Sequence, residues 1–302
     1  MIYIMCIFMI SRCTYFVRFV LYCCYNFINY TRRDLLFMEY VVLALLGVVT
    51  GTISVLFGIG GGMIIVPCML YIHYLIPNLN FSMHDAVGIS VMQMIFSSFF
   101  GSFINFIKRN IDIKDAFFLG LGGAIGASFS GFVLSGISSK NLMSIFLLVS
   151  CYTFYKFLSN SKPKPSQVNL STRKQSTILV IIGSITGLFA ISLGIGGGVI
   201  MTPLLAYYLG FSVKKTVVLS LFFIACASCA GSISFVSNGI MNSSVYGAGI
   251  ILGLFSLIGV IIGSKLIESI SLKLHRHILI NLYLLCIITT LYKVLSYYNI
   301  VS

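Results

Sequence analysis

Charged side chains are scarce in this sequence. Asp, Glu, Lys and Arg make up 8% of its 302 residues, whereas a soluble domain carries about 25%. Since 59% of the residues are hydrophobic, too few polar side chains remain to cover a globule in water. The composition therefore argues against a soluble protein and predicts an all-α integral membrane protein whose surface faces lipid or other helices.

Carboxylates are the rarest charged groups, with 6 Asp and Glu against 19 Lys and Arg and a net charge of +13. All of them lie near the ends of apolar runs. A cation site or proton relay in a membrane usually needs carboxylates within the spanning segments, so the expected substrate is neutral or anionic. Asp85 and the adjacent His84 open a helix and are interpreted as capping residues rather than a proton-coupling pair.

The basic residues stand between the apolar runs, where they set the topology of a membrane protein. No basic stretch is interleaved with aromatic residues, so nucleic acid is excluded as a partner. None of the nine cysteines stands with histidine at zinc spacing. Neither a metal nor a cofactor is therefore expected, and no residue is assigned a catalytic role.

Cys226 and Cys229 form a CxxC pair within an apolar helix. Without a polar, cationic setting, this pair favours packing over redox chemistry. With a partner such as Cys68, however, it defines the alternative hypothesis of a membrane thiol-redox protein.

Apolar runs recur along the chain at lengths that suit membrane helices. Helices are predicted at 39–57, 63–76, 85–107, 116–135, 142–158, 177–193, 199–209, 215–236, 245–266 and 277–297. Residues 38–158 and 177–302 are predicted to form two transmembrane repeats of about four to five segments each. Residues 159–176, which contain two Lys-Pro pairs, are interpreted as a basic cytosolic linker. Residues 1–37 are a hydrophobic extension, either an extra helix or a targeting segment.

The two halves carry the same motif. "LFGIGGGMIIVPCML" at 56–70 recurs as "SLGIGGGVIMTPLLA" at 192–206, an offset of 136 residues. At a later offset of 130 residues, three serines recur as three others: Ser90, Ser98 and Ser102, then Ser220, Ser228 and Ser232. Internal duplication is common in secondary transporters, so two related repeats are predicted.

Loop charge indicates that the second repeat is inverted. "KRNIDIKD" is basic, whereas its counterpart "SNGIMNSS" carries no Lys or Arg. Conversely, "FSMHDA" has none, whereas its counterpart "FSVKKT" has two lysines. Because cytosolic loops carry an excess of Lys and Arg, this exchange places "KRNIDIKD", the linker, "FSVKKT" and "LKLHRH" in the cytosol.

Each glycine cluster is expected to break a helix. Such breaks are tolerated in a membrane where they line a cavity or are buried in protein. Glycine allows positive φ and close approach of a ligand, and the helix that follows presents free N–H groups and a positive dipole end. Pro67 and Pro203 are expected in the first turns of these helices, where a missing N–H costs least. Two inverted copies would direct two such ends at one central anion site.

Tight helix packing is the alternative interpretation of the GIGGG clusters. It is the favoured interpretation of two other glycine stretches, "GLGGAIGASFSG" at 120–131 and "GVIIG" at 259–263. Packing explains the glycines of GIGGG but neither the proline nor the repetition. A nucleotide-binding loop is excluded, because no strand precedes the glycines and no Lys-Ser or Lys-Thr pair follows them.

The helix after each motif has a serine face. The three serines of each half fall within about 120° of one another on a helix. In the first half, Asn105 falls within the same arc and Gln93 lies about 60° beyond it, so one face of this helix is polar. Serines of this kind either bond carbonyls of their own helix or join helices. In the functional interpretation, the two faces line a path and donate hydrogen bonds to an oxyanion.

The paired motifs, each followed by a polar helix, resemble the signature of the TauE/SafE sulfite exporter family, also called the toluene sulfonate uptake permeases (TSUP). The resemblance covers about residues 38–295. It implies an integral transporter of small sulfur-containing or organic anions, such as sulfite, sulfonates or sulfoacetate. It points to the motif residues Gly58, Gly60, Gly61, Gly62, Pro67, Gly194, Gly196, Gly197, Gly198 and Pro203.

The leading hypothesis is a secondary transporter, not an enzyme, that moves a small anion by alternating access at the repeat interface. Its predicted substrate-binding residues are those glycines and prolines together with Ser90, Ser98, Ser102, Ser220, Ser228 and Ser232. The expected partners are the anion and the lipid bilayer, with a coupling ion left open, and the expected location is the plasma membrane. An anion channel and the thiol-redox protein are the alternatives.

Overall fold

The computed structural model describes residues 34–76, 79–108, 112–159, 172–267, 270 and 272–297. In these residues all regular structure is helical. The elements are α2 (Asp34–Phe57), α3 (Gly62–Tyr71), the 3-10 helix η1 (Ile72–Tyr74), α4 (Met83–Ile107), α5 (Ile113–Ser128), α6 (Ser130–Ser135), α7 (Ser139–Ser159), α8 (Thr172–Ser192), α9 (Gly198–Leu209), α10 (Val213–Ser237), α11 (Ser243–Leu266) and α12 (Leu272–Tyr297). Most of the predicted N-terminal extension and most of the predicted linker lie outside the described residues.

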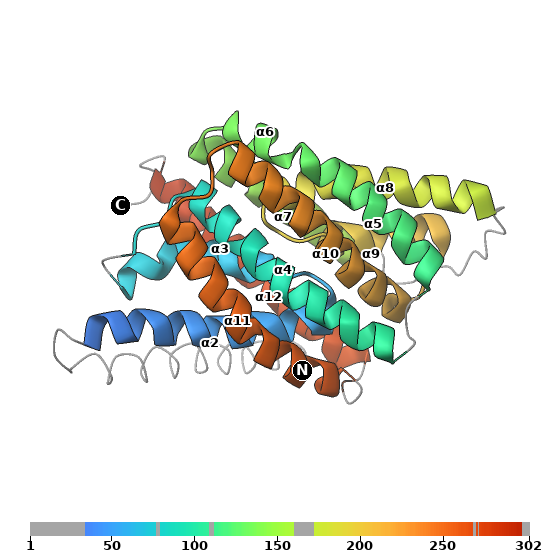
Figure 1. Cartoon of the computed structure of the whole chain (residues 1–302), viewed down its shortest axis with the longest axis horizontal. Coiled ribbons are helices and arrows are strands. Elements are labelled where there is room, and N and C mark those ends of the chain that lie inside the picture. Colours follow the sequence, from blue (N-terminus) through green and yellow to red (C-terminus); the bar gives the residue numbers. More distant parts are fainter. Residues whose placement is uncertain are drawn as a thin grey trace.

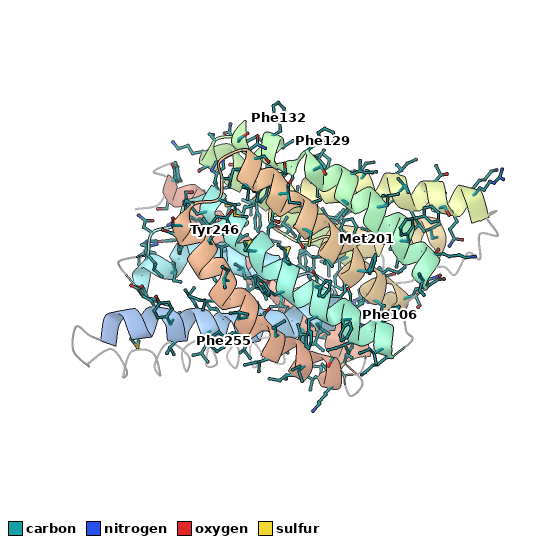
Figure 2. The ribbon with its side chains drawn as sticks, viewed as in Figure 1. Phe106, Phe129, Phe132, Met201, Tyr246 and Phe255 are labelled. Carbon is teal, nitrogen blue, oxygen red and sulfur yellow. The ribbon has the colours of Figure 1, made fainter. Side chains whose placement is uncertain are left out.

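Seven of the described helical segments are long and apolar enough to cross a membrane: Met38–Phe57, Met83–Ile107, Ile113–Ser135, Arg173–Ser192, Lys215–Ser237, Ser243–Leu266 and Arg276–Tyr297. Figure 2 shows Phe129 and Phe132 projecting from the upper edge of the molecule. Phe132 is 75% exposed, whereas Met201 is fully buried. Because large exposed apolar surfaces are stable against lipid and not against water, the chain is a multi-pass integral membrane protein.

Six long helices form a row in the order α8, α5, α10, α4, α11, α2, each packed on the next. In Figure 1, α10, α4 and α11 run side by side across the front, with α2 along the lower edge and α8 near the upper one. The short helices α3 and α9 pack on α4 and α10, and α7 packs on α12. Helices from the two halves of the chain alternate along this row, so each contact in it joins the first half to the second.

Glycines let the outer helices of this row approach closely. A Cβ atom built on Gly126 of α5 would lie 1.9 Å from the carbonyl oxygen of Ser184 in α8. One built on Gly259 of α11 would lie 2.0 Å from the carbonyl oxygen of Val48 in α2. Since neither position has room for a side chain, the packing role predicted for the stretches 120–131 and 259–263 is confirmed.

The helix predicted at 116–135 is interrupted at Phe129, which separates α5 from α6. The cause is a serine of α10. Ser234 Oγ donates a hydrogen bond to the Ser128 carbonyl oxygen at 2.7 Å and accepts one from the Gly131 N–H at 3.0 Å. A side chain inserted between the donors and acceptors of a helix breaks its hydrogen-bond ladder.

The start of α8 and the place of the prolines also differ from the prediction. α8 begins at Thr172, five residues before the predicted start, because Gln175 Nε2 donates to Asp115 Oδ1 at 2.7 Å and holds the first turn against α5.

Pro67 is the sixth residue of α3, inside the helix, and Pro203 is the sixth residue of α9. The prediction that both prolines occupy first turns is wrong, because each helix already begins at the last glycine of its motif.

Candidate substrate site

Two glycine loops lie at the starts of the short helices. The first glycine loop (residues 58–61) joins α2 to α3, and the second glycine loop (residues 194–197) precedes α9. Five of their residues have positive φ: +65°, +76° and +78° at Gly58, Gly60 and Gly61, and +65° and +78° at Gly194 and Gly196. Glycine is the residue that adopts such values without strain, so the backbone of both loops requires it.

The two loops touch each other at the buried centre of the molecule. A Cβ atom on Gly198 would lie 1.7 Å from the Gly58 carbonyl oxygen, and one on Gly62 would lie 1.9 Å from the Gly194 carbonyl oxygen. All residues of both loops are buried. The structure thus brings the two predicted motifs together, and the direct contact of their backbones leaves no room for a side chain at Gly62 and Gly198.

Each loop also lies against the central helix of the other half. Ser90 Oγ of α4 donates a hydrogen bond to the Gly194 carbonyl oxygen at 2.7 Å. On the other side, a Cβ atom on Gly58 would lie 2.4 Å from Ser220 Oγ of α10, whose hydroxyl donates to the Val217 carbonyl oxygen at 2.9 Å. Ser90 and Ser220 therefore stand at equivalent places beside the two loops.

For the other four predicted serines, the described residues show no hydrogen bond to either loop. Ser98, Ser228 and Ser232 donate to carbonyl oxygens one turn earlier in their own helices. Ser102 is buried, and its hydroxyl has no partner among the described residues. Hydrogen bonding within the helix, the alternative considered for these serines, therefore applies to Ser98, Ser220, Ser228 and Ser232.

A glutamine that was not predicted as a site residue faces the first glycine loop. Gln93 of α4 is fully buried, and neither its Oε1 nor its Nε2 has a hydrogen-bond partner among the described residues. A Cβ atom on Gly61 would lie 3.1 Å from Gln93 Oε1 and 3.4 Å from Nε2. The carboxamide is thus directed at the point where α3 begins. The sequence places Gln93 on a polar helix face but does not indicate what that face meets.

Three more buried polar residues accompany Gln93, and with it they form the first-half polar cluster: Thr50, Ser54, Gln93 and Ser97. Ser54 Oγ donates to Ser97 Oγ at 3.3 Å. Thr50 Oγ1 donates to the Leu46 carbonyl oxygen at 2.7 Å, and the Thr50 carbonyl oxygen lies 3.1 Å from a Cβ position on Gly61. No sequence pattern predicts this cluster, because it forms only where α2 contacts α4.

Charged residues meet at one end of the bundle. Lys215 Nζ, at the start of α10, lies 2.6 Å from Asp115 Oδ2 and 3.2 Å from Asp112 Oδ2, at the start of α5. Burial disfavours the Asp112 carboxylate, but the hydrogen bond and charge of Lys215 outweigh burial and lower the pKa of Asp112. The three residues join the starts of two neighbouring helices of the row.

Asp85 caps α4, as predicted. Its Oδ2 accepts a hydrogen bond from the Ser82 N–H at 2.9 Å, while its own N–H donates to Ser82 Oγ at 3.2 Å. Asp85 Oδ1 also accepts a hydrogen bond from Asn242 Nδ2 at 2.9 Å. The capping prediction does not hold for His84, whose ring nitrogens lie 2.9 Å from Ser139 Oγ and from the Ile137 carbonyl oxygen and so tie α4 to the connection before α7.

The thiols and possible metal ligands are dispersed. Cys226 and Cys229 are free thiols on α10, the first half-buried and the second exposed, and Cys68 of α3 is free as well. In the part of the chain that the structure describes, no group of three or more His, Cys, Asp and Glu side chains is arranged to hold a metal ion.

Comparison with known proteins identifies the family. Residues 43–290 match the family described as sulfite exporter TauE/SafE. The chain belongs to this family. A probable membrane transporter protein of Methanocaldococcus jannaschii is 29% identical to this TauE/SafE protein over 253 residues, which is 80% of this chain and 90% of the relative. A probable membrane transporter protein of Bacillus subtilis is 26% identical over 223 residues, 68% of this chain and 81% of the relative.

No solved structure matches the chain. The family and the names of these relatives indicate that the TauE/SafE protein is a membrane transporter. The seven apolar spans found among the described residues agree with that assignment.

Proposed function

We propose that this TauE/SafE protein is a secondary transporter of small anions of the sulfite, sulfonate and sulfoacetate class, working by alternating access. The observation that carries the proposal is the meeting of the two glycine loops, one from each half, at the buried centre. The family description, sulfite exporter, supports the substrate class. The substrate would bind where the loops, α3, α9 and the central helices converge.

The chemistry of this centre suits an anion. α3 and α9 begin at Gly62 and Gly198, so their positive dipole ends and first N–H groups lie beside the loops. The described carboxylate side chains lie at caps or within the first six residues of helices, and none of their oxygens is among the atoms nearest to a loop glycine: Glu39, Asp85, Asp112 and Asp115. No described carboxylate is therefore placed to repel an anion at the centre.

The helix contacts support two inverted repeats with a glycine break in each. The row reads α8, α5, α10 from one end and α2, α11, α4 from the other, and these are the helices that the duplication pairs. These two sets of three helices, each built from both halves of the chain, can tilt against each other around a fixed site, which opens first on one side of the membrane and then on the other.

The end contacts support the same topology. Lys215, Asp115 and Gln175 join the three segments "FSVKKT", "KRNIDIKD" and the linker end, all assigned to the cytosol from their charge. Asp85 and Asn242 join "FSMHDA" and "SNGIMNSS", which lack Lys and Arg. Loops assigned to one side of the membrane thus meet one another.

Uptake into proteoliposomes tests the proposal. Purified protein is reconstituted, and uptake of labelled sulfite, thiosulfate, sulfonates and carboxylates is compared with uptake by empty vesicles. We expect saturable uptake of sulfite or a sulfonate and counterflow when the vesicles are preloaded with the same anion. Absence of flux for every anion would refute a transporter of this class, and flux without saturation or counterflow would indicate a channel.

A further inference from the structure

The two halves differ sharply in polarity around their glycine loops. At the offsets of the duplication, three members of the first-half polar cluster have apolar counterparts: Ala190 for Ser54, Phe223 for Gln93 and Ala227 for Ser97. Phe223 is fully buried, and a Cβ atom on Gly197 would lie 2.0 Å from its ring. The carboxamide of Gln93 therefore faces the first loop, and the ring of Phe223 faces the second.

The carboxamide of Gln93 has no structural use in the described residues. Buried polar groups are nearly always hydrogen-bonded, because water has been lost and must be replaced. Ser54 and Ser97 bond each other, and Thr50 bonds its own helix, so the nearby hydroxyls do not serve Gln93. Both of its polar atoms lie beside the start of α3 and lack a partner.

We infer that Gln93 binds the polar head of the substrate at the start of α3, so that the site is one-sided within a duplicated scaffold. This inference rests on the proposed function and names the residue that holds the anion. Phe223 provides the opposite, apolar wall. The substrate binds to one half through hydrogen bonds and lies against the other through packing alone.

The carboxamide of Gln93 also limits which anions would satisfy all the hydrogen-bonding groups of the site. Nε2 donates and Oε1 accepts, and the start of α3 adds N–H donors. A monoanion that carries one O–H group, such as hydrogen sulfite, satisfies both atoms: its oxygens accept from Nε2 and the helix, and its O–H donates to Oε1. A sulfonate offers acceptors alone and leaves Oε1 without a partner.

Gln93→Met tests the inference, because methionine keeps the length of the side chain and removes both polar atoms. In proteoliposomes we expect the KM for sulfite to rise at least tenfold. Gln93→Glu keeps the shape and adds a negative charge, and we expect it to abolish uptake. Thr186→Val is the matched control, since it removes another buried, unpaired polar atom, Oγ1, from the second half; its KM should stay within twofold of the wild type.

Thermal unfolding in detergent separates binding from structure. Without ligand, Gln93→Met should unfold at the wild-type temperature or above it, because a buried unpaired amide has been removed. Sulfite should raise the unfolding temperature of the wild type and of Thr186→Val but not that of Gln93→Met. A lower unfolding temperature for Gln93→Met together with a wild-type KM would show a structural role and overturn the inference.

Two further outcomes keep this inference distinct from the proposed function. If the wild type transports no anion at all, the proposed function fails. If the wild type transports sulfite and Gln93→Met does so with an unchanged KM, the inference alone fails. In the wild type, the KM for methanesulfonate should exceed that for sulfite near neutral pH, and equal values would overturn the requirement for an O–H group.

Discussion

The two glycine loops share the letters GIGGG but not the same structure. Gly61 has a φ of +78°, whereas its counterpart Gly197 has a φ of −67°. Gly61 lies beside the carboxamide of Gln93, and Gly197 lies against the ring of Phe223. The duplication has thus kept the close contact of the two backbones while the side chains around them have diverged. The surroundings of the two loops are therefore not symmetric.

The two ends of the bundle show a parallel difference. Lys215 and Asp112 stand at the positions equivalent to Asp85 and Asn242, an offset of 130 residues in each case. The first pair joins opposite charges at 3.2 Å, with Asp115 added at 2.6 Å, and the second is a hydrogen bond between a carboxylate and an amide at 2.9 Å. We expect the end that carries Lys215 to be held more strongly.

The largest expected effect comes from Gly198→Ala, which tests the contact that both loops share. Its Cβ atom would lie 1.7 Å from the Gly58 carbonyl oxygen, and backbone on both sides prevents relief. We expect a loss of about 3 kcal/mol or more in the free energy of unfolding and little monodisperse protein on size exclusion.

Gly247→Ala is the matched control for this loop variant. A Cβ atom at Gly247 in α11 meets nothing within 4 Å, and alanine favours the helix by up to about 1 kcal/mol. Similar unfolding temperatures for the two alanine variants would show that the loops do not touch.

Lys215→Met should have the next largest effect, because it leaves the 8%-exposed side chain of Asp115 without its cation. Lys215 is itself 33% exposed, so solvent reduces the loss to about 1–2 kcal/mol. Asp85→Asn, at the equivalent position of α4, keeps its size and should cost less than about 1 kcal/mol. If the two variants lowered the unfolding temperature equally, the expected difference in strength between the two ends of the bundle would be wrong.

Asp112→Asn sharpens the same comparison through pH. Because Lys215 lowers the pKa of Asp112, the pair stabilises the folded protein above about pH 4, the range in which the unfolded carboxyl is ionised. This contribution is lost as the pH falls through the lower, folded-state pKa. The wild type should unfold at a slightly higher temperature than Asp112→Asn at pH 7, and the gap should close in acid. A gap that widens on acidification would contradict this sign.

The smallest effect is expected when Cys68, Cys226 and Cys229 are all changed to alanine. All three are free thiols, and a cysteine in such a setting packs as a small hydrophobic residue, so sulfite uptake should stay within about twofold of the wild type. Loss of uptake without loss of folded protein would favour the thiol-redox alternative.

The helices were predicted closely because local signals mark them. Ser82 and Ser212 cap α4 and α10 through hydrogen bonds to N–H groups three residues on, and both helices begin within two residues of the predicted starts. The break at Phe129 was not predicted, because it is made by Ser234, which is remote in the sequence. Hydrophobic periodicity and capping signals describe neighbouring residues, so they cannot predict a helix break that is caused by a side chain of another helix.

The candidate site was predictable in its backbone and not in its side chains. GIGGG and its repetition identified the loops, and their meeting agrees with a site shared by both halves. Of the six predicted serines, Ser90 and Ser220 lie beside the loops, whereas Gln93 was passed over. A polar face at helical spacing names several candidates, and only the contact with Gly61 selects one of them.

By itself, the sequence determined the membrane class, the helices and the duplicated glycine loops. These follow from composition, from hydrophobic periodicity and from the conformations open to glycine, all of which act within a few residues of chain. The tertiary structure alone decided that Gln93 meets Gly61 while Phe223 meets Gly197, and that Lys215 meets Asp112 and Asp115. Those contacts join residues that are 26 to 103 positions apart, so they exist only once helix packing has brought distant segments together.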